Sequence, residues 1–345
     1  MASVPSVPSV PPPAAPSASA SVTLARSPAL VPLLARGALL SPFKRPRPDA
    51  VFPRTRLVLP SLRVDPARLA AYERVCGFPA AGTGRTGEAG ETEKAEKAEK
   101  AGETEKAGGT GEGSGALPLT YPHVLGFPAA MRLMSGLDFP LPLLGLVHTS
   151  IEITRHRDVP VAGTHGLSVH LEGPAPHRRG TEATVVTGLR SPGGGLVWES
   201  RSTYLARHPT SGPPSSGPSP SGRPTPPPEE ESVTARAQPL PVVDAWLLAG
   251  DTGRRYGAAS GDRNPIHLYP LTARLFGFPR AIAHGMWTVA RCLAAHGAPE
   301  AVTVRADFKA PVLLPGTVTY GARDGCFELR GPGDRLHLTG EVRPA

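Results

Sequence analysis

The sequence contains few of the residues that build a disulfide framework or a large aromatic core. Its three cysteines, Cys76, Cys292 and Cys326, lie far apart among 345 residues. Their odd number and wide spacing exclude a disulfide framework and a CxxC metal site. Aromatic residues make up only 5% of the chain. We therefore expect a protein of the reducing cytoplasm, with an ordered part well below its full length.

Long apolar runs and blocks of basic charge are also missing. The N-terminal stretch lacks the basic and apolar regions of a signal peptide. The most apolar early segment, residues 30–40, is interrupted by Pro32 and Arg36 and is too short to span a membrane. The net charge is +8, but the basic residues are scattered and not interleaved with aromatics. We therefore expect no nucleic-acid binding, whereas a basic surface suits a small phosphate-bearing ligand.

Proline and glycine are abundant instead, with 43 and 39 residues, and they divide the chain. Residues 1–50 are predicted to be a disordered Pro/Ser/Ala-rich tail. Residues 81–115 hold a Glu/Lys/Ala near-repeat with no apolar face, and residues 208–235 are a Pro/Ser/Gly linker. The remaining segments, 51–207 with its insertion and 236–345, are expected to be two folded domains of similar ordered size.

These two segments share one order of elements. In the second, residues 242–260 resemble a helix, and a polar turn and a short apolar segment follow. Residues 283–297 are then apolar nearly all round, which predicts a buried helix. The first segment has corresponding helices at 68–78 and 119–136. Strand-like runs follow the later helix in each segment, at 146–154, 164–173, 181–189 and 196–206, and at 301–308, 316–323, 326–331 and 336–343. The order predicts an approximate internal duplication.

The polar turn, SGDRNPIH at residues 260–267, carries the candidate chemistry. Pro265 disfavours helical backbone at Asn264, so the segment should be a turn on which Asp262 and His267 converge. A carboxylate and an imidazole at one point can hold a water molecule between them. One group takes its proton while the other orients it or donates to a neighbouring atom.

Gly285 follows, at the start of the predicted buried helix. Its N–H has no partner within the helix, and the helix dipole adds positive potential there. Glycine also lets a ligand approach the backbone closely. Such a site can stabilise the oxyanion of a thioester enolate. Water activation beside an oxyanion site indicates addition of water to, or its removal from, a double bond conjugated to a carbonyl.

Simpler interpretations of the same residues stay open. Asp262 and Asn264 are residue types that are common in turns, and His267 can be a structural histidine. Asp262, His267 and His284 can also form a metal site of two histidines and one carboxylate. In that site, the turn would have to direct Asp262 and His267 towards His284, which is distant in the sequence. We therefore expect no metal, and we interpret His284 as a residue that begins the helix.

The whole run SGDRNPIHLYPLTARLFGFPRAIAHGM resembles the signature of the MaoC-like family, the (R)-specific enoyl-CoA hydratases and (3R)-hydroxyacyl-thioester dehydratases. The segment DFKAPVLLPGT at 307–317 also resembles the family's strand and turn after the helix. The residues that match the signature are Ser260, Asp262, Asn264, Pro265, Ile266, His267, Gly277, Phe278, Ile282, His284, Gly285 and Met286.

This resemblance implies an α+β hotdog fold, a curved antiparallel sheet wrapped round one long helix. Residues 119–157 resemble the N-terminal repeat of two-hotdog actinobacterial dehydratases, in which the catalytic dyad is absent. Here, too, VCGF at residues 75–78 stands where the aspartate loop should begin. We therefore expect a double hotdog in one chain, a pseudo-dimer whose second half is catalytic. The first half could then accommodate a long acyl chain.

The resemblance also implies roles for individual residues. Asp262 and His267 would be the dyad that activates water or takes up the leaving hydroxyl. Asn264 would orient the dyad, and Ser260 would support the loop. The Gly285 N–H would polarise the thioester carbonyl.

The function that these roles imply is a hydratase or dehydratase of acyl thioesters carried by coenzyme A or by acyl carrier protein. No metal or redox cofactor is expected, because addition of water moves no electrons to a carrier. Lys309 can contact coenzyme A phosphates or be an ordinary solvated charge. A non-catalytic acyl-thioester-binding hotdog is the alternative from another class, and the presence of both dyad residues disfavours it. Association of two such chains into a homodimer stays open.

Overall fold

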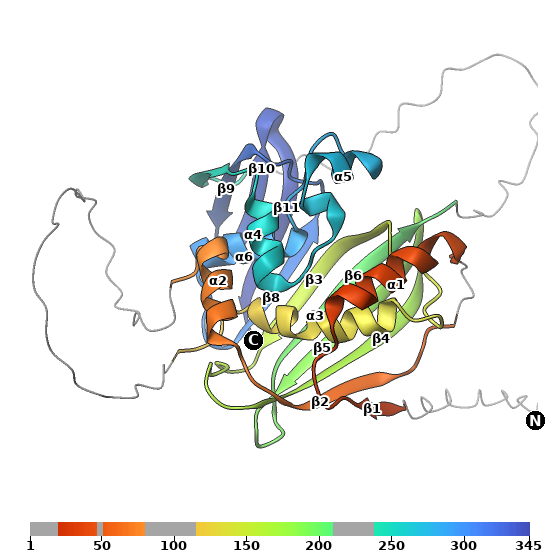
Figure 1. The fold of residues 1–345 in the computed structure, drawn as a ribbon. Helices are drawn as coiled ribbons and strands as arrows, with labels where there is room; N and C mark the ends of the chain where they lie inside the picture. Colours follow the sequence, from red (N-terminus) through yellow and green to blue (C-terminus); the bar gives the residue numbers. More distant parts are fainter. Residues whose placement is uncertain (1–19, 47–50, 80–114, 210–237) are drawn as a thin grey trace, which may run out of the picture.

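The computed structural model describes residues 20–46, 51–79, 115–209 and 238–345 (Figure 1). Most of the predicted charged insertion and proline-rich linker lies outside the described residues. The described strands form one continuous sheet in the order β1-β2-β4-β5-β6-β3-β8-β11-β10-β9-β7. Within these ranges no helix is long and apolar enough to cross a membrane.

The first half of the sheet wraps round helix α3 (Tyr121–Met134), the helix predicted at 119–136. Most of its side chains are buried, as its apolar composition predicts. The strands of this half are β2 (Arg56–Leu62), β3 (Leu146–Arg155), β4 (His165–His177), β5 (Gly180–Arg190) and β6 (Leu196–Arg207). Helix α2 (Pro66–Cys76) precedes α3 in the chain.

The second half repeats this arrangement round helix α6 (Gly285–His296), which buries Trp287, Val289 and Cys292. Its strands are β7 (Val242–Leu248), β8 (Val302–Phe308), β9 (Gly316–Arg323), β10 (Cys326–Gly331) and β11 (Arg335–Pro344). Helix α4 (Thr252–Ser260), the short turn η2 (Pro265–His267) and helix α5 (Pro270–Leu275) lie between β7 and α6.

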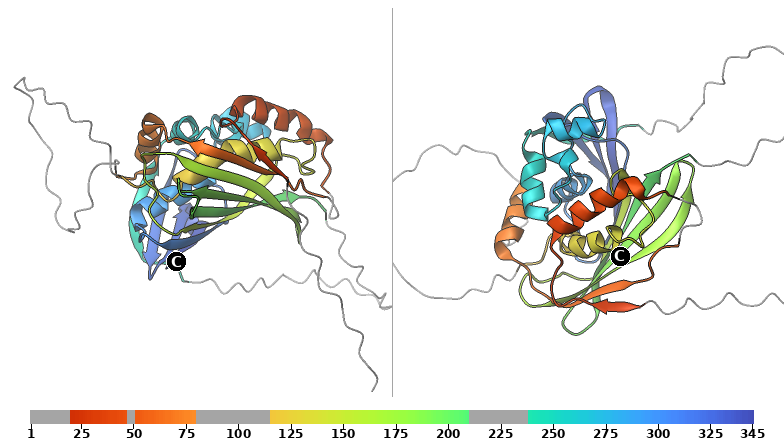
Figure 2. Two further views of the ribbon diagram at one scale, coloured as in Figure 1. Left: turned by 90° about the horizontal axis from the view of Figure 1, so that it is seen from below. Right: turned by 45° about the vertical axis from the view of Figure 1, so that its right-hand side comes forward.

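Antiparallel pairing of β3 with β8 joins the two halves, with Ile151 opposite Ala306 and Ile153 opposite Val304. All four of these side chains are buried. The left view in Figure 2 shows the helices gathered along one side of this shared sheet. Two curved sheets, each with its own buried helix, form one pseudo-dimer, and the predicted double hotdog is confirmed.

Two sequence predictions about secondary structure are wrong. Residues 242–248 form strand β7 and not the start of a helix. Trp246 and Leu248 are buried while Leu247 between them is exposed, which is the two-residue period of a strand paired on one side. The helix of this segment begins only at Thr252.

The predicted tail is also ordered in part. Residues Ser21–Thr23 form β1, which pairs in parallel with β2, and Leu30–Leu40 form helix α1, followed by the turn η1 (Ser41–Phe43). Leu30, Leu33 and Leu34 of α1 pack against the core. Pro32 does not break this helix, because it stands in the first turn, where no helical hydrogen bond needs its N–H.

The polar turn that follows α4 folds back onto that helix, and two glycines leave the space for it. A Cβ atom on Gly253 would lie 2.0 Å from the carbonyl oxygen of His267. One on Gly257 would lie 2.8 Å from the carbonyl oxygen of Asp262. The glycines stand four residues apart, on one face of the helix, so this face fixes the position of the turn.

We predict that Gly253→Ala lowers the free energy of unfolding by about 1–3 kcal/mol, because the added methyl group overlaps a backbone carbonyl. The loss is expected although alanine has the higher helix propensity. Urea and thermal unfolding measure it. Gly193→Ala is the matched control, because the nearest atom to its added Cβ lies 4.0 Å away. Equal stability of the two variants would contradict the close packing described above.

Candidate active site

The turn at residues 260–267 forms part of the wall of a cavity of about 1070 Å³ that both halves of the chain line. Three side chains of this turn make local hydrogen bonds. The Asp262 N–H donates to Ser260 Oγ (3.2 Å), the Asn264 N–H to Asp262 Oδ1 (3.2 Å), and the Ile266 N–H to Asn264 Oδ1 (3.4 Å). Each bond spans two residues, the pattern of Asx and Ser turns. Ser260 and Asn264 thus hold the backbone on either side of Asp262.

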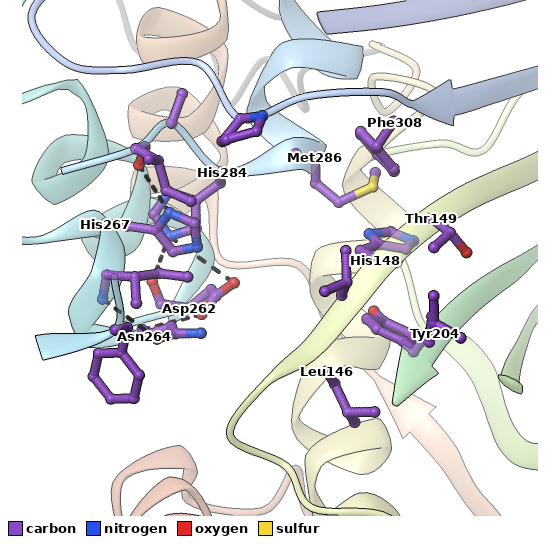
Figure 3. Close-up of a pocket in the computed structure, with 18 of the residues that line it drawn as sticks. Leu146, His148, Thr149, Tyr204, Asp262, Asn264, His267, His284, Met286 and Phe308 are labelled. Atoms are coloured by element: carbon purple, nitrogen blue, oxygen red, sulfur yellow. Dashed lines mark hydrogen bonds and ion pairs between the residues drawn. The ribbon is translucent and has the colours of Figure 1, made fainter. Parts of the chain in front are cut away.

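Asp262, His267 and His284 come together on one wall of the cavity (Figure 3). One ligand atom from each of the three side chains lies within 4.8 Å of the others. His267 Nδ1 lies 2.8 Å from the Ile282 carbonyl oxygen and donates to it, which leaves Nε2 as the unprotonated nitrogen. A water molecule between the carboxylate and this nitrogen can hydrogen-bond to both.

His284 stacks on His267, with ring centroids 3.7 Å apart. Its Nε2 donates to the Asp262 carbonyl oxygen at 2.9 Å and lies 3.9 Å from the Asp262 carboxylate. The sequence-based expectation of a distant third group is therefore wrong, because α6 begins directly beside the turn. His284 uses Nε2 to hold the backbone of the turn, so a metal ion would have to compete with that hydrogen bond. The absence of a metal from this site stays a prediction.

Burial sets the protonation states of this group. It raises the pKa of the Asp262 carboxyl, a shift that the nearby His267 opposes. It lowers the pKa of His267 and takes that of His284 well below the usual range. Both imidazoles are thus neutral at physiological pH, and His267 can accept a proton.

The start of α6 supplies a backbone donor beside the turn. His284 precedes the helix in an extended conformation, and no side chain caps the helix start. The Gly285 N–H therefore has no acceptor within the helix. A Cβ atom at this position would lie 2.9 Å from the ring of Phe308, so a larger residue would displace that ring. An oxygen with developing negative charge can bind here.

Comparisons with known proteins identify the family of this chain. The profile of the MaoC-like domain matches residues 228–323. The 3-hydroxyacyl-thioester dehydratase X of Mycobacterium tuberculosis is 35% identical over 283 residues, which are 81% of this chain and 84% of that protein. The chain belongs to the MaoC-like dehydratase family.

Solved structures of MaoC-like proteins share the fold. The crystal structure of HtdX from Mycobacterium tuberculosis has a TM-score of 0.62 and 30% identity, and the match covers 84% of this chain and 100% of that one. A MaoC-like dehydratase from Phytophthora capsici has a TM-score of 0.60 over 87% of this chain and 98% of its own. That second protein is only 16% identical, so it supports the fold alone.

Lys309, the candidate phosphate contact in this MaoC-like chain, lines the cavity just after β8. Its Nζ lies 3.5 Å from Asp307 Oδ2, and 43% of its side chain is exposed. The lysine is therefore accessible to a ligand, although Asp307 partly balances its charge. Its role stays a prediction.

Several residues of the cavity and its support were missed by sequence reasoning. Arg68 of α2 donates from Nε to the Ala259 carbonyl (2.7 Å) and from Nη2 to the Ser260 carbonyl (2.6 Å). It thereby caps the end of α4 just before Asp262. No local pattern marks this arginine, because its partners lie on the other half of the pseudo-dimer. The first half also contributes His123, His148 and Tyr204 to the cavity.

We predict that Arg68→Ala costs about 2–3 kcal/mol of unfolding free energy, because two carbonyls lose charged donors. Amide hydrogen exchange should also become faster across residues 259–264. Denaturation and exchange mass spectrometry measure both effects. Arg74→Ala is the control, because Arg74 is exposed on the same helix. If both variants exchange alike, Arg68 does not position the turn.

The histidines of the cavity predict a loss of stability in acid. Burial lowers the pKa of His123 to about 4 and that of His148 to about 3, and it also lowers those of His267 and His284. Below the ordinary histidine pKa of 6.5, the unfolded chain binds more protons than the folded protein. The free energy of unfolding therefore falls as the pH drops through that value. Each histidine then costs up to about 2 kcal/mol at pH 5. The raised pKa of Asp262 has the opposite effect on the free energy of unfolding. It favours the folded state at low pH, and this contribution is lost as the pH rises.

Thermal unfolding between pH 7.5 and 5 measures this dependence. His148→Phe should have a shallower decline than the wild-type protein, because one buried imidazole has been removed. Identical slopes in the two proteins would contradict the assignment of the acid sensitivity to this cavity.

Proposed function

We propose that the protein catalyses the reversible dehydration of (3R)-hydroxyacyl thioesters to trans-2-enoyl thioesters, with Asp262 and His267 as its catalytic dyad. The observation that carries the proposal is the meeting of this carboxylate and imidazole beside the uncapped N–H of Gly285. The relative from Mycobacterium tuberculosis bears the name of a 3-hydroxyacyl-thioester dehydratase, which supports the same reaction.

In the hydration direction, the dyad holds a water molecule next to the double bond. His267 Nε2 takes a proton from the water, and the Asp262 carboxylate accepts the second hydrogen bond and orients the oxygen. The oxygen adds to C3 while negative charge develops on the thioester oxygen. The Gly285 N–H stabilises that charge, and the proton taken from water returns to C2. Dehydration follows the same path in reverse. No metal or redox cofactor takes part in this proposal.

The proposal specifies the carrier of the acyl group only as a phosphate-bearing thioester. Five basic side chains line the cavity, and cationic groups suit both coenzyme A and the phosphopantetheine of an acyl carrier protein. They are Arg178, Arg179, Arg207, Arg263 and Lys309. An acyl-carrier-protein-bound substrate is the second candidate. The three thiols are free in the structure, which suits the reducing cytoplasm where we place the reaction.

The cavity also supports a long acyl chain as substrate. It continues from the dyad into the first half, where Met131, Met134 and Leu143 line it together with Leu34 of α1. These side chains present no charge and suit an alkyl chain. A cavity of about 1070 Å³ exceeds the needs of the shortest acyl groups.

We predict that Asp262→Asn and His267→Ala each lower kcat/KM for hydration of trans-2-enoyl-CoA at least about 100-fold, because each removes a group that handles the proton. Assays with enoyl-CoAs of increasing length measure the loss and the length profile together. His156→Ala, a half-exposed position outside the cavity lining, is the control.

The outcomes separate the alternatives. Activity retained in both dyad variants would contradict the proposed mechanism. A folded wild-type protein that acts only on acyl-carrier-protein thioesters would establish the second candidate. Inactivity on both carriers would favour a non-catalytic thioester-binding protein. A preference for the shortest, crotonyl-type substrate would contradict the role given to the first half.

A further inference from the structure

A second group of polar rings lies across the cavity from the dyad, on the first half of the chain (Figure 3). His148 of β3 stacks on Tyr204 of β6, with centroids 4.5 Å apart and an interplanar angle of 15°. His123 of α3 lies parallel to His148 at 6.3 Å, and Phe308 of β8 lies 4.7 Å from it. Three elements of one half and a strand of the other thus fix the His148 ring.

This group contains polar atoms whose hydrogen bonding is incomplete. His148 Nε2 and His123 Nδ1 are buried and have no hydrogen-bond partner among the described residues. Buried polar atoms in proteins are as a rule hydrogen-bonded, so each such atom needs an explanation. A bound ligand that brings the missing partner is one explanation for atoms that line a cavity.

The protonation state of His148 determines what that partner must be. A hydrogen bond with the Ser150 backbone raises the pKa of His148, as expected when the imidazole donates to a carbonyl. Because Nε2 has no partner, we assign the proton of the ring to Nδ1, which is the nitrogen left to interact with the Ser150 backbone. Burial outweighs this effect and lowers the pKa to about 3, so the ring is neutral. His148 Nε2 is therefore an acceptor, and its partner must be a donor.

The position of His148 indicates which part of a substrate would reach it. Phe308 is the ring against which Gly285 packs, and the same ring lies beside His148. One aromatic ring thus separates His148 from the site of the thioester oxygen. The same cavity is also lined by the first-half residues Leu146, Met131 and Met134. His148 accordingly faces the cavity across from the dyad, where a group on the acyl chain beyond the reacting carbons can reach it.

We propose that His148 Nε2 accepts a hydrogen bond from a hydroxyl group on the acyl chain, so that the preferred substrates are thioesters with a hydroxyl beyond C3. This inference rests on the proposed function and names its substrate class. A plain alkyl chain leaves the nitrogen without a partner. A keto group at the same carbon brings a second acceptor and no donor, so the site should distinguish a hydroxyl from both.

Binding of unreactive ligands tests this selectivity independently of turnover. The probes are saturated acyl-CoA thioesters of one length in three matched forms: plain alkyl, hydroxyl-bearing and keto-bearing. The substituent is placed at successive carbons from the fifth onward, and calorimetry measures each Kd. We expect the best-placed hydroxyl to tighten binding at least about tenfold over the matched alkyl and keto thioesters. Equal affinities of the wild-type protein for all three forms at every position would overturn the proposal.

Variants at His148 identify the group responsible. His148→Phe keeps a ring between Tyr204 and Phe308 and removes the acceptor, so the ratio of alkyl to hydroxyl Kd should fall to about one. His148→Gln restores an acceptor and should recover part of the ratio. His156→Phe makes the same change outside the cavity lining and should leave the ratio at the wild-type value.

Two results would refute the assignment to His148. The first is a hydroxyl preference that persists in His148→Phe. The second is a preference that Tyr204→Phe removes while His148→Phe does not, which would assign the hydroxyl to Tyr204. Failure of the proposed function would be visible separately, as absence of hydration activity in a wild-type protein that still binds these unreactive thioesters.

Discussion

The pairing of β3 with β8 is the contact on which the rest of the molecule depends. It joins two curved sheets into one and places Phe308, at the end of β8, beside His148 of β3. The cavity lies over this junction, with the dyad on one side and the first-half rings on the other. Helix α2 strengthens the same junction, because Trp287 of α6 donates to the Val75 carbonyl at 2.8 Å. Neither half would form this cavity alone.

The two halves share a fold but not a chemistry, and the starts of their central helices show the reason. Helix α6 begins with Gly285, whose N–H faces no side-chain cap. Helix α3 begins with Tyr121 and Pro122, so its second residue has no N–H and its first has a bulky, buried side chain. The first half therefore cannot reproduce the oxyanion donor that we propose for the second. The first half instead contributes residues that line the cavity.

Much of this organisation could be predicted because it is local in the sequence. Pro265 and the short-range hydrogen bonds of Ser260, Asp262 and Asn264 fix the turn within a few residues, and alternating apolar residues identified most strands. Strand β7 was misassigned because its apolar run fits both a helix and a strand. The positions of Arg68, His148 and His284 could not be derived in this way. Each depends on elements that only the folded sheet brings together.

Covalent continuity of the two halves has a thermodynamic consequence. In an assembly of separate hotdog chains, the β3–β8 junction would form in a bimolecular step, and dilution would favour its dissociation. Here the junction forms within one polypeptide, where each half meets the other at a high effective concentration. The integrity of the cavity is thus independent of how much protein is present. Each polypeptide then contributes one copy of the proposed dyad among its described residues, and no association equilibrium is needed to complete the cavity around it.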